Sequence, residues 1–90
     1  MHAIDKLLKN HKKLIHSDMK KVISHVQREE GEWFINTLMI EGCDAPFKYK
    51  RKKKYKSLEG QKVNLTYYLD KETIAGIDIE VMRVVRVKIA

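Results

Sequence analysis

The chain has 90 residues, enough for one domain and too few for two. It contains 19 Lys and Arg against 12 Asp and Glu, a net charge of +7. The whole excess lies in one run at residues 48–56, Lys-Tyr-Lys-Arg-Lys-Lys-Lys-Tyr-Lys, because removing its seven cations from 19 leaves 12 against 12. Charge concentrated in this way predicts a polyanionic partner at one place on the protein.

The cysteine count, the apolar segments and the residue spacings make several classes of protein unexpected. The single cysteine, Cys43, cannot form an internal disulfide, which suits a reducing compartment. No apolar secretory core or membrane span of roughly 20 apolar residues is present, so we expect a cytoplasmic protein. The histidine and cysteine spacings match no metal site, and no nucleophile–base constellation stands out. We therefore expect no metal, no cofactor, no small-molecule substrate and no enzymatic activity.

Residues 1–30 are predicted to be helical. Apolar residues recur there at spacings of three and four, which is typical of an amphipathic helix, and no Pro or Gly precedes Gly31. Two alternatives remain open: one helix of about 25 residues, or two helices broken near His16 with Ser17 as the second N-cap. Gly31 is expected to cap the helical segment. The stripe consists of Ile4, Leu7, Leu8, Ile15, Met19, Val22 and Val26.

Residues 32–90 are predicted to be β. Strands are expected at 32–40, 47–56 and 62–69, and a fourth region at 73–89, interrupted near Gly76, forms one or two more. A helix followed by four or five mainly antiparallel strands predicts an α+β fold for the single domain 1–90. The strands would form either an antiparallel sheet or a small, partly open barrel of the OB type.

The second and third predicted strands are expected to pair as a hairpin. The segment Leu58-Glu59-Gly60 matches a type I turn whose last residue, a glycine, adopts a left-handed conformation. This loop places Lys54 opposite Asn64 and Tyr55 opposite Val63. The parities agree along both strands, which supports the register.

The predicted hairpin carries the candidate binding site. Lysines on one strand face lie about 6.5–7 Å apart, since residues i and i+2 share a face, and such a row can follow a phosphate backbone. Tyr68 is expected on the lysine face as a base-stacking side chain, while Phe47 and Tyr49 face the core. The predicted nucleic-acid-binding residues are Lys48, Lys50, Arg51, Lys52, Lys53, Lys54, Lys56, Lys62 and Tyr68.

These features favour a small basic nucleic-acid-binding domain that binds RNA or single strands with little sequence specificity. A competing interpretation is that the lysines only keep a sheet edge soluble. The alternative function is a non-enzymatic interaction or assembly module. There the helix stripe would pair with a second copy as a homodimer, and the basic strand would remain solvated or dock on an acidic partner.

Overall fold

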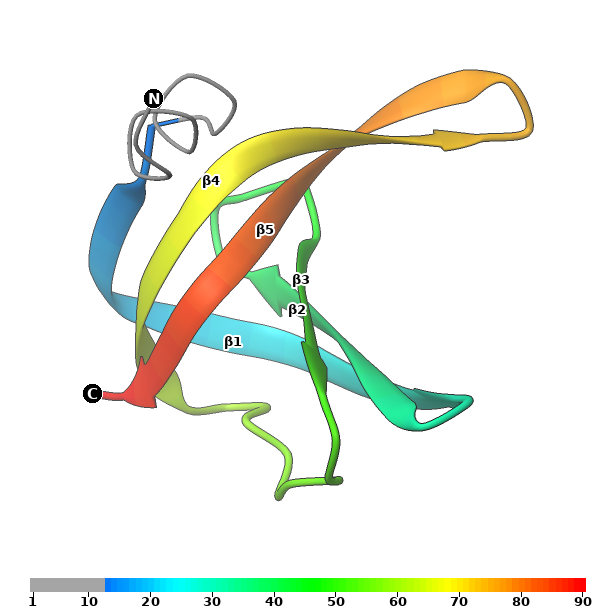
Figure 1. Ribbon diagram of the computed structural model, residues 1–90. Coiled ribbons are helices and arrows are strands. Elements are labelled where there is room, and N and C mark those ends of the chain that lie inside the picture. The colour runs from blue at the N-terminus through cyan, green and yellow to red at the C-terminus, as the bar shows by residue number, and fades with distance from the viewer. Residues whose placement is uncertain (1–12) are drawn as a thin grey trace, which may run out of the picture.

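The computed structural model describes residues 13–90, which form five strands (Figure 1). None of these residues is helical, so the α+β prediction is wrong and the described chain is all-β. Residues 1–12 of the predicted helical segment lie outside the described residues. The strands are β1 (Ile15–Glu30), β2 (Trp33–Ile40), β3 (Phe47–Arg51), β4 (Lys62–Ile74) and β5 (Ile77–Ile89).

The five strands close a barrel in the order β1-β2-β3-β5-β4. Neighbouring strands are antiparallel, except that β3 and β5 run parallel, with Phe47 opposite Met82 and Lys48 opposite Arg83. Within this order, β4-β1-β2-β3 is a Greek key. A five-stranded Greek-key barrel is the architecture of the OB class. The expectation of a β-barrel is therefore confirmed, without the helix that was to precede it.

β1 occupies residues that the apolar spacing assigned to a helix. Its register shifts between Ser17 and Lys20 against β4, and again between Val22 and Ser24 against β2. Met19, within the first shift, has a left-handed φ of 55°. Each bulge inserts a residue into the two-residue alternation of a strand, so apolar side chains recur at spacings that imitate a helix. The bends let β1 pair with β4 in its first half and with β2 in its second.

Two tight loops produce the hairpins that extend beyond the barrel on the right of Figure 1. Gly31 does not cap a helix but opens the β1–β2 loop with a φ of 63°, as a type II′ turn requires. In the β4–β5 loop both Ala75 and Gly76 have positive φ, 52° and 80°, as in a type I′ turn. The break predicted near Gly76 is thus a turn, and β5 is one strand.

The predicted hairpin between the basic run and β4 does not form. β3 pairs with β2 on one edge and β5 on the other, while β4 pairs with β1 and β5, so the predicted register is wrong. Residues 52–61 instead form a loop from β3 to β4. Gly60 does have a positive φ of 84°. It lies in a turn where the Gln61 N–H donates to the Leu58 carbonyl at 2.9 Å.

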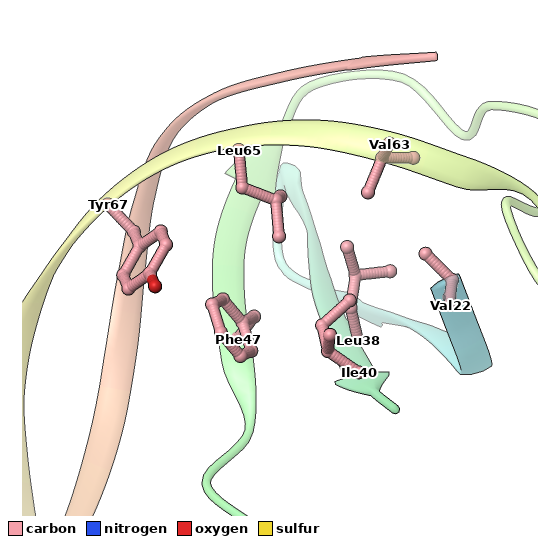
Figure 2. Close-up of a cluster of buried hydrophobic side chains, with 7 residues drawn as sticks. All are labelled: Val22, Leu38, Ile40, Phe47, Val63, Leu65 and Tyr67. Carbon is pink, nitrogen blue, oxygen red and sulfur yellow. The ribbon is translucent and has the colours of Figure 1, made fainter. Parts of the chain in front are cut away.

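The core lies inside the barrel, and its side chains converge from β1, β2, β3 and β4 (Figure 2). The rings of Phe47 and Tyr67 meet edge to face with their centroids 4.8 Å apart. Phe47 is fully buried and Tyr49 packs half-buried against the cluster, which confirms both as core residues. The buried cluster comprises Val22, Leu38, Ile40, Phe47, Val63, Leu65 and Tyr67.

Candidate nucleic-acid interface

The basic run, residues 48–56, begins in β3 and continues as the loop to β4. Lys48 and Lys50 belong to the strand, which ends at Arg51, whereas residues 52–56 are exposed in the loop. The run therefore does not present one straight row of lysines on a strand face. The positive charges of the run instead extend from β3, in the barrel wall, onto the loop to β4.

The strand register decides which predicted residues share the outer face of the barrel. Lys48 lies opposite Thr37 of β2 and Arg83 of β5, and Arg83 lies opposite Tyr68 of β4. Because directly opposed residues project from the same side of a sheet, these four side chains form one row. Tyr68 and Lys48 thus share a face, as expected, but β5 lies between them.

Lys48 is held in a charge network. Its Nζ lies 2.6 Å from Glu72 Oε1, and Arg83 donates to Asp70 Oδ2 at 3.1 Å and to Glu72 Oε2 at 2.9 Å. Two cations and two carboxylates therefore cancel. We conclude that Lys48 is less available to a phosphate than its place in the basic run suggests.

The network shifts the pKa of Glu72 and that of Arg83. The hydrogen bond from Lys48, assisted by Arg83, lowers the pKa of Glu72 despite the opposing effect of burial. Burial alone would lower the pKa of Arg83, but hydrogen bonds to Asp70 and Glu72 raise it above the ordinary value. Glu72 and Arg83 consequently both stay charged at neutral pH, which keeps the ion pair between them intact.

A groove of about 670 Å³ lies over this row, lined by both hairpins and by β3. On the β1–β2–β3 side, Arg28 lies opposite Ile35 and Ile35 opposite Lys50, so both cations project to the outer face. On the β4–β5 side, Tyr68 and Glu72 line the groove. The groove therefore has a neutralised floor at the charge network, and its β1–β2–β3 side carries the exposed cations Arg28 and Lys50 and the exposed carboxylate of Glu30.

The other cations of the run are exposed, and none forms an ion pair within residues 13–90. Lys62 is exposed too, but it starts β4 opposite Lys21 and lines neither the groove nor the other described cavities. Thus six predicted site residues come together as one unpaired basic segment, here called the lysine segment. Its cations are Lys50, Arg51, Lys52, Lys53, Lys54 and Lys56.

Aromatic rings lie beside these cations. Lys52 Nζ lies 5.2 Å from the Trp33 ring centroid, and the Arg51 guanidinium carbon lies 5.5 Å from Tyr49 and 5.8 Å from Tyr55. Trp33 and Tyr55 are exposed. Burial raises the pKa of the Tyr49 phenol, and the Arg51 charge opposes this shift only in part. Tyr55, expected opposite Val63 in the predicted hairpin, is instead an accessible ring among lysines.

The loop at residues 52–61 lies along β1, beyond the point where β4 leaves that strand. Successive contacts run in opposite directions along the two segments, as they would between antiparallel strands. They join Gln27 with Tyr55, His25 with Leu58, and Val22 with Gly60 and Gln61. The loop is therefore anchored at several points and holds its aromatic and basic side chains in defined positions.

Sequence reasoning missed Trp33, Arg28 and Gln27. Trp33 received no role within the predicted strand 32–40, and the other two residues fell in the predicted helical segment 1–30. The useful signal was Gly31-Glu32, a pair that can form a two-residue hairpin loop. Reading it as a turn would have made residues 15–30 a strand and placed Arg28 near the β2 face.

Comparison with family models, with curated proteins and with solved structures finds no match to this chain. Its site is therefore interpreted from its own geometry. The described residues include no helix long and apolar enough to cross a membrane. In the same part of the chain, no three His, Cys, Asp or Glu side chains gather in a metal-binding arrangement.

Proposed function

We propose that the protein binds single-stranded nucleic acid, RNA or DNA, along the lysine segment and the adjoining groove. One observation carries this proposal: six neighbouring cations have no carboxylate partner within residues 13–90, and the exposed rings of Trp33 and Tyr55 lie among them. Phosphates neutralised by such cations release counterions, which drives binding. Exposed rings stack on any base, so little sequence specificity is expected.

The architecture is compatible with this function. Barrels of the OB type bind oligonucleotides on the face of strands 2 and 3, although a fold does not by itself assign a function. Here that face carries the exposed Lys50 and, from the adjacent β1, Arg28. The role we propose is binding rather than catalysis, in the cytoplasm, where single-stranded RNA is abundant.

The test is binding of a labelled single-stranded RNA of about 15 nucleotides, a length near the upper site size of one OB barrel, across a salt series. If about five phosphates are engaged, log K should fall with log salt with a slope of about −3.5. Lys53→Glu/Lys54→Glu should reduce the steepness by about 1.4, because two phosphate contacts are lost. Neither lysine makes a described contact, so the fold should survive.

The matched control is Lys71→Glu/Lys88→Glu. It changes the net charge by the same amount at exposed positions outside the lysine segment and the groove. This control should lower the affinity for RNA because the net positive charge falls. The slope of log K against log salt should remain that of the parent protein. Equal slope changes in both variants, or no binding of RNA at low salt, would refute the proposal.

Trp33 provides a second readout, because it is the single tryptophan and is 40% exposed. Stacking of a base on its ring should quench its fluorescence when RNA is added. Heparin supplies the anionic charge without bases, and should compete for the lysines without the same quenching. Identical behaviour of RNA and heparin would show an anion-binding surface with no nucleic-acid function.

A second candidate function is interaction with an acidic protein. It is favoured by exposed apolar side chains on the β4–β5 hairpin, among them Leu69, Ile74 and Ile77, which could pack against a protein. The helix-mediated homodimer expected from the sequence has no basis in residues 15–30, because they form β1. A stable complex or dimer that polynucleotide does not disturb, detected by light scattering, would favour this candidate.

A further inference from the structure

A second cavity, of about 340 Å³, lies between the loop at residues 52–61 and the inward side of the barrel wall. Sites for small ligands occupy about 300–1,000 Å³ and are mostly apolar with a few polar groups. Leu58, Val87 and Ile89 supply apolar surface to this cavity, and Tyr49 and Tyr55 supply aromatic surface. Its dimensions and lining therefore suit one flat ring.

The charged groups of the cavity are all cationic. Arg51 and Lys56 line it, and no carboxylate of the described residues does. The Arg51 guanidinium lies within 5.5 Å of the Tyr49 centroid and 5.8 Å of the Tyr55 centroid, so charge and aromatic surface occupy the same site. A ligand that combines an aromatic ring with a phosphate, that is, a nucleotide, matches this arrangement.

The polar side of the cavity is formed by His25 and Asn36, whose donors and acceptors can be assigned. The Leu58 N–H donates to His25 Nδ1 at 2.8 Å, so the ring hydrogen of the neutral imidazole lies on Nε2, which donates to Asn36 Oδ1 at 2.8 Å. Asn36 Nδ2 donates to the Phe34 carbonyl at 3.1 Å, which uses one of the two N–H donors of the amide. Asn36 also lines the cavity, and a carbonyl oxygen on a base is the partner that its second N–H would take there.

The cavity is adjacent to the groove that we assign to the single strand. Beyond Lys48 and Arg83, β3 and β5 separate, and a gap of about 150 Å³ opens between them. Tyr49 lines the groove, the gap and the cavity alike, and Val87 lines both gap and cavity. A strand lying in the groove can therefore reach the cavity with a base.

We infer that this cavity accepts one base of the bound single strand, with its ring against Tyr49 and Tyr55 and its phosphate at Arg51 and Lys56. The inference rests on the proposed function and adds to it a base-binding pocket on the inward side of the barrel, apart from the outer groove. The loop contacts with β1 hold Tyr55 in place before the ligand arrives, which reduces the entropy lost on binding.

The experiment compares two probes of about 15 nucleotides, within the site size of a single OB barrel: oligothymidylate, and a strand of the same length without bases. Tyr55→Ala should weaken binding of oligothymidylate about 5- to 150-fold, the range for losing one stacked base. It should leave binding of the abasic strand unchanged, because the lysines remain. Tyr55→Phe keeps the ring and should bind both probes like the parent protein. Tyr55 is exposed, so neither substitution removes core packing.

Methyl NMR of the full-length protein locates the base independently. Oligothymidylate should shift the methyl signals of Leu58, Val87 and Ile89, which line the cavity, and the abasic strand should not. The pocket is refuted if the parent protein binds oligothymidylate while Tyr55→Ala binds it equally well, or loses both probes equally. That result leaves the proposed function standing. A parent protein that binds neither probe refutes the pocket, and failure to bind the labelled RNA as well refutes the proposed function.

Discussion

The side-chain amide of Gln27 holds the backbone of Tyr55 through two hydrogen bonds. Its Nε2 donates to the Tyr55 carbonyl at 2.6 Å, and the Tyr55 N–H donates to its Oε1 at 3.2 Å. A neighbouring strand would offer the same donor and acceptor, but β4 pairs with β1 only as far as Lys21. The loop thus takes the place of a strand beside β1, and Gln27 supplies the link.

Replacing Gln27 with Ala should loosen this loop. Two hydrogen bonds are lost in a partly exposed site, so we expect about 1 kcal/mol less stability for the closed loop, or a roughly fivefold larger open population. Trypsin cleaves after lysine, and its rate at residues 52–56 reports that opening. Gln27→Glu tests the same contact in another way. It keeps the acceptor for the Tyr55 N–H but places a carboxylate against the Tyr55 carbonyl. Cleavage at the parental rate in both variants would contradict this role.

How much of the fold could be predicted depends on how regular each strand is. In β4, Val63, Leu65 and Tyr67 alternate inward without interruption and are buried, so the part of the strand at 62–69 could be predicted from the sequence, although β4 continues to Ile74. β1 could not be, because bulges at Met19 and near Ile23 break its alternation, and both side chains are exposed. The pairing of β1 with β4 joins distant parts of the chain, and tertiary contacts outweighed the local helical spacing.

The candidate site was predictable in position but not in detail. The order of residues alone indicates that the positive charge concentrates at residues 48–56. It does not indicate that Glu72 neutralises Lys48, because that carboxylate comes from another strand and meets Lys48 only when the barrel closes. The accessible ring of Tyr55 was also unpredictable, since β3 ends at Arg51 and the expected strand alternation no longer applies.

The hydrogen bond between His25 and Asn36 should stabilise the barrel under the loop. Asn36 is only 2% exposed, and His25 Nε2 is the described donor to its Oδ1. His25→Phe should cost about 1–3 kcal/mol in the free energy of unfolding, because a buried acceptor is left without a partner. Urea denaturation of His25→Phe, Asn36→Leu and the double variant measures the coupling. Strictly additive losses would contradict a direct interaction.

The β4–β5 loop should be open to stabilisation at Ala75. Both loop residues have positive φ, and Ala75, at 52°, is the one with a side chain that disfavours this conformation. Ala75→Asn should raise the free energy of unfolding by about 0.5–1 kcal/mol, since Asn-Gly is the preferred type I′ pair. Thermal denaturation should show a Tm higher by about 2–8 °C. Ala75→Val is the opposing control, and a higher Tm for Val than for Asn would reject the turn assignment.

The charge network under the groove should make the free energy of unfolding depend on pH in the acid range. The pKa of Glu72 is lowered in the folded protein by Lys48 and Arg83. Its carboxylate therefore stabilises the fold at pH values above its unfolded pKa of about 4.3, and this contribution disappears as the pH falls through the lower folded pKa. Glu72→Gln should accordingly destabilise the protein near neutral pH, and its deficit relative to the parent should shrink as the pH drops below about 4.

Urea denaturation of both proteins over a pH series measures that deficit. Glu80→Gln is the matched control, because Glu80 is an exposed residue of β5 with no ion pair among the described residues. It should show little deficit, since exposed charges contribute little to stability. A deficit for Glu72→Gln that stays constant with pH would mean that the Gln side chain disturbs packing, and that the ion pairs with Lys48 and Arg83 contribute nothing.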